Sequence, residues 1–252
     1  MDTVIPRLIQ GQGTPEAQWQ AWFSQTPLPV VAPADLLRHS SRVVIVAPHP
    51  DDEILTTAAL LRCCADTDTP CLVVSVTDGE ASHLGSPLWP QQHLARTRAL
   101  ESAAALALMA PAAQVVRLGL PDGGVADCTA QLAQALGGLL QPSDALVCPW
   151  RNDGHPDHEA TGHTCAEVAR QVGCRLLELP IWTWHWATPE DPQVPWHRAA
   201  AIVLAPEQLA LKRQALACFH SQLLPDPSTG KEAILPAWAT ARLLRPFEVV
   251  FV

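Results

Sequence analysis

From residue 42 onward, short apolar runs rich in β-branched residues alternate with longer stretches of helical periodicity. This alternation is typical of βαβ units, in which helices cover both faces of a parallel sheet. The runs are continuously apolar, which indicates strands buried on both faces. We therefore expect a single three-layer α/β domain with a mostly parallel sheet. The predicted strands cover 43–47, 71–76, 115–120, 145–148, 176–181, 199–204 and 248–252, and the predicted helices 52–65, 91–109, 127–140, 157–172 and 206–219.

The point at which this pattern begins indicates the domain organisation. Residues 1–40 are rich in Pro, Gln and Trp and contain one short helical candidate, so we expect an N-terminal extension that packs on the main body. Residues 41–252 contain no linker between two separate cores and are expected to form the one domain. Two proline-rich segments, 180–196 and 223–237, are predicted loops long enough for a binding or lid role.

Composition excludes several classes of partner. The 25 acidic side chains outnumber the 16 basic ones, which argues against nucleic-acid binding and against a polybasic membrane surface. No segment approaches the roughly 18 apolar residues that a membrane span needs. The eight cysteines form no C-x-x-C pair and no signal-peptide pattern is present, which predicts a reducing, cytoplasmic location. The composition carries no signal for an oligomeric state.

Polar side chains follow the first predicted strand directly, in the run HPDDE at residues 49–53. In open parallel sheets, ligands bind outside the carboxyl ends of the strands, where this segment emerges. Proline and acidic residues also favour the first turn of a helix, and this explains part of the segment. It does not explain a histidine beside two consecutive aspartates, which points to a functional site.

The fourth predicted strand ends in a comparable way, with the run DGHPDH at residues 153–158. The helix that follows has a core-facing stripe at Thr161 and Cys165, and His158 extends this stripe by one step. His158 is therefore expected to face the strand ends, whereas His155 lies in the preceding loop. The two segments together predict a His/Asp cluster drawn from neighbouring α/β units.

This residue set suits metal-assisted hydrolysis. His49, Asp52 and His158 supply two imidazoles and one carboxylate, which leaves coordination positions open for water or substrate. The side chains of the two consecutive aspartates diverge, so one can bind a metal while the other serves as a base. His155 is a candidate for stabilising a developing oxyanion, and Asp157 for orienting His155.

Both runs resemble the signatures of the PIG-L/LmbE-like de-N-acetylase family, [A/P]-H-P-D-D-E and H-P-D-H, and the likeness covers about residues 42–222. The resemblance implies a Rossmann-like fold and zinc-dependent removal of an acetyl group from an N-acetylglucosamine-type amine, with one Zn²⁺ per chain and a small N-acetylated sugar as substrate. Carried over position by position, it implies His49, Asp52 and His158 as metal ligands, Asp51 as general base, His155 as the group that stabilises the oxyanion and Asp157 as its support.

Two further residues, Arg98 and Asp153, are expected to contact the substrate. Each also has a structural alternative. For Arg98 it is a surface ion pair with Glu101, three residues further along the same helix. Asp153 stands where some relatives have a tyrosine, and this chain contains no tyrosine. Its carboxylate can bond a sugar hydroxyl or stabilise the turn that follows. Trp182 is expected to pack against the sheet, whereas Trp184, Trp186 and Trp196 are open between core packing and a platform for a sugar ring.

Two other functions are compatible with the sequence. His49-x-Asp51 with a distant histidine matches the facial triad of non-haem Fe(II) oxygenases, although those enzymes are built on antiparallel barrels. A non-catalytic sugar-binding relative is the other, but such a module needs neither the Asp51 base nor the His155 donor.

Overall fold

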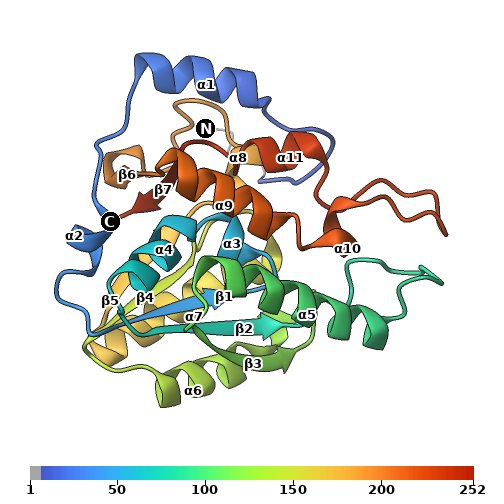
Figure 1. Cartoon of the computed structure of the whole chain (residues 1–252), viewed down its shortest axis with the longest axis horizontal. Helices are drawn as coiled ribbons and strands as arrows, with labels where there is room; N and C mark the ends of the chain where they lie inside the picture. Colours follow the sequence, from blue (N-terminus) through green and yellow to red (C-terminus); the bar gives the residue numbers. More distant parts are fainter. Residues whose placement is uncertain (1–6) are drawn as a thin grey trace, which may run out of the picture.

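Within residues 7–252, which the computed structural model describes, seven strands form one sheet. The strands are β1 (Arg42–Ala47), β2 (Cys71–Thr77), β3 (Gln114–Leu120), β4 (Asp144–Pro149), β5 (Arg175–Leu179), β6 (Ala199–Val203) and β7 (Phe247–Phe251). Their order is β3-β2-β1-β4-β5-β7-β6 (Figure 1). β1 to β5 are parallel, whereas β7 runs antiparallel to β5 and to β6. The predicted α/β fold with a mostly parallel sheet is confirmed.

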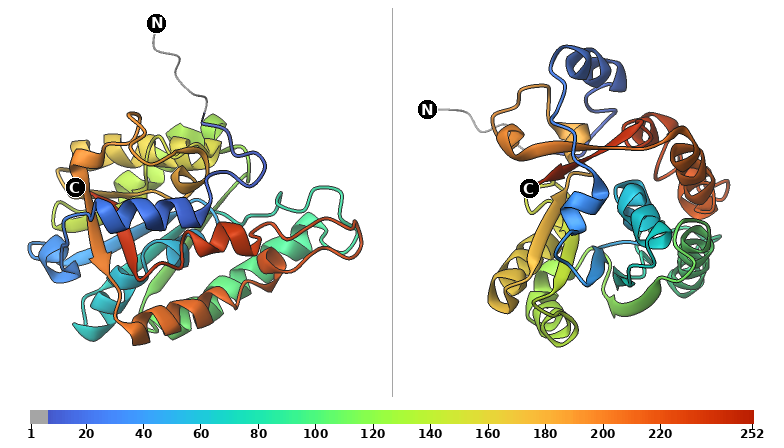
Figure 2. Two further views of the ribbon diagram at one scale, coloured as in Figure 1. Left: turned by 90° about the horizontal axis from the view of Figure 1, so that it is seen from above. Right: turned by 60° about the vertical axis from the view of Figure 1, so that its left-hand side comes forward.

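Helices cover both faces of this sheet (Figure 2). One face carries α2 (Pro33–Leu37), α3 (Asp52–Leu55), α4 (Ala58–Asp66), α5 (Gln91–Met109) and α9 (Pro206–Leu216), and the other carries η1 (Val125–Cys128), α6 (Thr129–Leu139) and α7 (Pro156–Val172). The remaining elements are α1 (Glu16–Gln25), α8 (Thr183–Trp186), η2 (Trp196–Arg198), α10 (His220–Leu223) and α11 (Ala237–Ala241). None of the helices in residues 7–252 is long and apolar enough to cross a membrane.

The inner strand β1 shows how the two helical layers share the sheet. Val43 and Ile45 of β1 point into the core under α3, α4, α5 and α9. Val44 and Val46 point the other way, into the core under α6 and α7. Because successive side chains of a strand face opposite sides, a continuously apolar run is what burial between two helical layers requires.

The predicted helix over residues 52–65 is interrupted, and the structure has α3 and α4 in its place. Thr56 and Thr57, which separate them, have backbone angles outside the helical region. The free N–H groups at the start of α4 are satisfied by Glu248 of β7, whose carboxylate oxygens lie 2.9 and 3.0 Å from the nitrogens of Ala58 and Ala59. A side chain some 190 residues away thus completes the break, which local periodicity could not predict.

Helix α1, in the segment predicted to be an N-terminal extension, contacts the rest of the chain through aromatic side chains; residues 1–6 of that segment lie outside the described residues. Trp19 of α1 is fully buried, and its ring centroid lies 5.1 Å from that of Trp184. The predicted loop 180–196 contains α8, where Trp184 and Trp186 are buried in this same cluster. These two tryptophans therefore serve packing. Trp182, which was expected to pack, is only partly buried against the core and also lines a cavity described below.

Lys212 of α9 and Glu248 form a buried ion pair of 2.7 Å that joins α9 to β7. Replacing Lys212 with Met leaves the Glu248 carboxylate buried without its cation. We expect the free energy of unfolding to fall by about 3–5 kcal/mol, measured by urea denaturation. The exposed Glu207→Gln on the same helix should change it by no more than about 0.5 kcal/mol. If Lys212→Met lowered the free energy of unfolding no more than the control does, the ion pair would not have the predicted stabilising role.

Candidate active site

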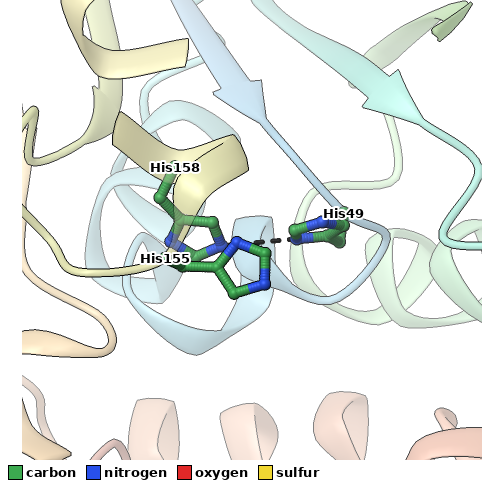
Figure 3. Close-up of side chains that lie close together, drawn as sticks. All are labelled: His49, His155 and His158. Carbon is green, nitrogen blue, oxygen red and sulfur yellow. Dashed lines mark hydrogen bonds between the residues drawn. The ribbon is translucent and has the colours of Figure 1, made fainter. Parts of the chain in front are cut away.

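The two polar segments meet where the strand order changes direction. The chain leaves β1 for β2 on one side, and β4 lies on the other side of β1, with Ile45 beside Val147 in parallel register. The crevice outside the carboxyl ends of two such strands is where open α/β sheets bind ligands. His49 follows β1, and His155 and His158 stand at the start of α7 after β4 (Figure 3).

Three potential ligand atoms converge at this point. The Nδ1 atom of His49 lies 3.3 Å from Nε2 of His158, and Oδ2 of Asp52 lies 3.4 and 3.3 Å from these two nitrogens. A tetrahedral zinc ion with bonds of about 2.0–2.1 Å holds its ligand atoms about 3.3–3.4 Å apart. The predicted ligand set therefore has the spacing that a zinc ion requires, and three ligands of a tetrahedral ion leave a fourth position for water or substrate.

The other nitrogen of each imidazole faces a carboxylate. Nε2 of His49 lies 3.2 Å from oxygens of both Asp122 and Asp157. Nδ1 of His158 lies 2.8 Å from Oδ2 of Asp153. Each carboxylate accepts a hydrogen bond from the imidazole nitrogen that it faces. The other nitrogen of each ring, Nδ1 of His49 and Nε2 of His158, is then the one available to a metal.

The charges of the cluster favour a cation. Burial alone would lower the pKa of His49, but hydrogen bonds with Asp122 and Asp157 raise it well above its usual value. Burial is likewise outweighed at His158, where Asp52 raises the pKa to about 9, and the same pairing lowers the pKa of Asp52. A group of side chains that draws protons onto two imidazoles offers the same attraction to a divalent ion, which competes with those protons.

Asp51, the predicted base, is held in a strained backbone conformation. Its φ is 139°, in a region that costs a non-glycine residue about 1–3 kcal/mol. The surrounding bonds impose it, since the N–H of Asp51 donates to Glu53 at 2.9 Å and its carboxylate accepts from Arg98 at 3.0 Å. Strain of this kind persists where the structure over-determines it, and it commonly marks functional sites.

The electrostatics of Asp51 suit proton transfer. Burial raises the pKa of Asp51 to about 7, and the nearby Arg98 guanidinium acts in the opposite direction. Arg98 is itself buried and also donates to the carbonyl oxygens of Pro50 and Gly79. It does not form the surface pair with Glu101, whose carboxylate instead accepts from Ser221. Arg98 lines the cavity, and its guanidinium also holds the carboxylate of Asp51 in place.

His155 lies beside the converging ligands as a neutral donor. Its ring centroid is 4.9 Å from that of His49 and 4.8 Å from that of His158. Nδ1 of His155 accepts from the backbone N–H of Asp157 and so caps α7, which leaves Nε2 to carry the proton. Burial, followed by the positive charges of the two neighbouring histidines, lowers the pKa of His155 to about 3.

The structure places Asp157 and Asp153 differently from the sequence-based expectation. The Asp157 carboxylate does not bond the His155 side chain; it contacts His49 and accepts from the backbone of Gly123 and Val125. Asp153 has no exposed surface and does not line the cavity. Its oxygens accept from Ile181, Trp182, Thr183 and His158, which leaves no room for a sugar hydroxyl. Both aspartates therefore position the histidines.

A cavity of about 290 Å³ opens beside the cluster and includes residues that the sequence did not single out. Asp122 is one of them; it lies in a Pro-Asp-Gly turn after the third predicted strand, within a segment that also resembles the family. Other walls come from distant parts of the chain, including Ser82, Gln222, Leu235 and Arg242. Leu235 lies in segment 223–237, for which a binding or lid role was predicted, whereas no local pattern marks Ser82 or Arg242 as part of a site.

Comparison with known proteins identifies the family. The sequence profile of PIG-L, described as GlcNAc-PI de-N-acetylase, matches residues 44–169, half of the chain. The chain belongs to the PIG-L family. The region of this PIG-L member that the profile matches contains both motifs and the residues His49, Asp52 and His158, whose atoms converge. No curated protein matches the sequence at a significant level.

Solved structures share the fold of this PIG-L protein at low sequence identity. N,N′-diacetylchitobiose deacetylase from Pyrococcus horikoshii matches with a TM-score of 0.58 and 17% identity over 82% of this chain and 79% of that chain. The zinc-inhibited form of teicoplanin deacetylase Orf2 matches with a TM-score of 0.59 and 17% identity over 83% of this chain and 97% of that chain. The 4-carboxy-2-hydroxymuconate hydratase GalB from Pseudomonas putida KT2440 matches with a TM-score of 0.54 and 14% identity over 72% of this chain and 80% of that chain. The fold alone thus does not specify amide hydrolysis.

Proposed function

We propose that this protein is a zinc-dependent hydrolase that removes the acetyl group from an N-acetylglucosamine-type sugar or a related amine. The observation that carries this proposal is the triangle of His49 Nδ1, Asp52 Oδ2 and His158 Nε2, with sides of 3.3–3.4 Å. Asp51 lies at the same cavity, as a hydrolase of this kind requires of its base. Membership of a de-N-acetylase family supports the same reaction.

The side chains divide the chemistry among themselves. A zinc ion at the triangle would lower the pKa of a water molecule and polarise the acetyl carbonyl. Asp51 takes the proton of the attacking water, and its pKa of about 7 matches a base that works near neutrality. The Nε2–H group of His155 donates to the carbonyl oxygen as negative charge develops there. The proton then passes to the sugar nitrogen as the C–N bond breaks, which releases acetate and a free amine.

The two alternative functions fit the structure less well. In an Fe(II) facial triad, Asp51 would have to be a ligand, yet its carboxylate pairs with Arg98 and the neighbouring Asp52 provides the converging oxygen. A binding module has no use for a strained, buried Asp51. Metal analysis after aerobic purification distinguishes the zinc hydrolase from the Fe(II) oxygenase. We expect stoichiometric zinc, and an iron-dependent oxidation would contradict the proposed hydrolase.

Acetate release is the direct test of the proposed reaction. The zinc-loaded protein is incubated with a panel of N-acetylglucosaminides, and both acetate and the new amine are quantified. We expect equal amounts of the two products, and loss of both after removal of the metal with a chelator. Binding of these sugars by the zinc-loaded protein without any acetate release would instead identify a non-catalytic relative.

Asp153 provides a prediction about the metal itself. In Asp153→Asn, an amide replaces a carboxylate that accepts hydrogen bonds from His158 and from three backbone N–H groups. The imidazole then loses the partner that fixes its tautomer, so we expect zinc affinity to fall about 10–100-fold in competition with a chelator. Glu167→Gln, at an exposed position of α7, is the control. Equal zinc affinities of the two variants would contradict this role of Asp153.

The compartment is also part of the proposal. All eight cysteines are free in the structure, and Cys64, Cys71, Cys148 and Cys165 are buried as small apolar side chains. This supports a reducing compartment, the cytoplasm. Cell fractionation tests it, and recovery of the protein outside the cytoplasm would contradict it.

A further inference from the structure

Two very short helices, α8 and α11, contribute His185 and Arg242 to the wall of the cavity. α8 has four residues and α11 has five, and Arg242 directly follows α11. A helix of about one turn is not stable by itself, because few internal hydrogen bonds offset the entropy that its residues lose. The positions of these two side chains must therefore be fixed by contacts with other parts of the chain.

Residues 10–14, close to the start of the described chain, hold the backbone of α8. The N–H group of Thr14 donates to the carbonyl oxygen of His185 at 2.9 Å. The hydroxyl of Thr14 donates to the carbonyl oxygen of Ala187 at 2.6 Å. Carbonyl groups at the end of a helix lack partners within the helix, so Thr14 satisfies two groups that α8 itself cannot.

The same segment holds the two side chains in the cavity wall. Nε2 of His185 lies 3.0 Å from the carbonyl oxygen of Gln10 and donates to it, which leaves Nδ1 to accept from Arg242 at 3.1 Å. The other terminal nitrogen of Arg242 donates to the carbonyl oxygen of Gln12. Both side chains are buried, where water competes little for these hydrogen bonds. Residues 10–14 thus set the tautomer of the imidazole and the place of the guanidinium.

Gly13 shows how closely this segment lies on α8. Its φ is 60°, a conformation that glycine adopts without steric cost. A Cβ atom at this position would lie 2.3 Å from the carbonyl oxygen of His185 and 2.7 Å from Cγ of its ring. A larger residue therefore fits at position 13 only if the segment or α8 moves.

We infer that residues 10–14 position His185 and Arg242 in the cavity and thereby determine how tightly the sugar substrate binds. This inference rests on the proposed deacetylase function, in which the sugar occupies the cavity. The segment lies outside residues 44–169, which the family profile matches, so membership of the family does not imply this role.

The segment should act on substrate binding and not on the metal. The hydrogen bonds described above reach α8 and Arg242, whereas the proposed zinc ligands follow β1 and begin α7. A disturbed segment should therefore displace the cavity wall and leave the ligand atoms in place. In kinetic terms, KM should rise while kcat and the zinc content change little.

Gly13→Ala tests the inference, because the new methyl group must displace the segment or α8. The zinc-loaded protein is assayed for acetate release with the methyl glycoside of N-acetylglucosamine. We expect KM to rise about tenfold or more, with kcat within about threefold of the wild type and zinc still at one per chain. A wild-type KM in Gly13→Ala overturns the inference, and so does loss of its zinc.

Gly173→Ala is the matched control. Gly173 directly follows α7 with a φ of 79°, so alanine there has the same kind of backbone strain. Its Cβ atom, however, would have none of the described atoms outside its own helix and chain neighbours within 4 Å. We expect its KM to equal that of the wild type within about twofold. An equal rise of KM in both variants would assign the effect to backbone strain and overturn the inference.

Thr14 provides a second test that needs no steric clash. Thr14→Val keeps the shape of the side chain but leaves the carbonyl oxygen of Ala187 without its donor. We expect KM to rise about threefold or more, and Thr14→Ser, which keeps the hydroxyl, to restore it to within about twofold of the wild type. A wild-type KM in Thr14→Val, or a Thr14→Ser variant as impaired as Thr14→Val, overturns the inference.

Hydrogen exchange separates this inference from the proposed function. If the wild type releases no acetate from any N-acetylglucosaminide, the deacetylase proposal fails, but amide exchange measured by mass spectrometry still reports on the cavity wall. Residues 183–187 and 237–242 should exchange about tenfold faster in Gly13→Ala than in Gly173→Ala, with no difference over residues 157–165. Equal exchange of the wall residues in the two variants overturns the inference, whether or not the protein turns over a substrate.

Discussion

Asp51→Asn is expected to lower kcat for acetate release by about 10²–10⁴-fold, because the amide cannot accept the proton of the attacking water. The substitution keeps the size of the side chain and an oxygen that accepts from Arg98, so the strained turn at Asp51 should be retained. Zinc content should stay at one per chain, because Asp52 and not Asp51 supplies the converging oxygen. Steady-state kinetics and metal analysis on the same preparation measure both quantities.

The matched control for Asp51 is Asp127→Asn, which removes a carboxylate from an exposed position of η1. Its kcat should equal that of the wild type within about twofold. If Asp51→Asn retained a tenth or more of the wild-type turnover, Asp51 would not be the base. If it lost its zinc instead, Asp51 would have to be a ligand and the division of roles between the two aspartates would be reversed.

His158→Gln is expected to empty the metal site. It removes the Nε2 atom that closes the triangle with His49 and Asp52, and leaves only two of the converging atoms. We expect zinc content to fall from one per chain to below about one tenth after dialysis against a weak chelator, with acetate release lost in proportion.

His163→Gln is the control for His158, because His163 lies on the same helix, α7, with its side chain exposed. It should bind zinc and release acetate as the wild type does. Circular dichroism of both variants should show the wild-type helix content, which separates metal loss from unfolding. Stoichiometric zinc in His158→Gln would contradict the ligand set.

The three converging side chains could be predicted from sequence because His49 and Asp52 directly follow a strand and His158 stands in the first turn of the helix after the next strand of the sheet. Once an apolar run is recognised as a buried parallel strand, its carboxyl end must open onto the binding edge of the sheet. His49 and Asp52 follow β1 directly, and His158 lies on the core-facing stripe of α7. Local periodicity and the rule for parallel sheets therefore suffice to bring these three residues together.

The roles of Asp153, Asp157 and Arg98 could not be predicted in the same way. The oxygens of Asp153 are taken by the backbone of residues 181–183, which only the packing of α8 against the turn brings near. Asp157 reaches His49 on another strand, and Arg98 reaches Asp51 from α5. Such partners are set by long-range contacts, so a side chain predicted to meet substrate can instead hold a neighbour in place.

The sequence by itself determined the layer architecture, the edge of the sheet that carries the candidate site and the side chains that converge there. These follow from short-range patterns: continuous apolar runs, helical stripes and polar residues at strand ends. Only the tertiary structure decided which nitrogen of each imidazole faces the centre, why α3 and α4 are separate, and that residues 10–14 bind His185 and Arg242 in the wall of the cavity. Hydrogen-bond partners and buried charges depend on residues far apart in the chain, and the fold alone brings these together.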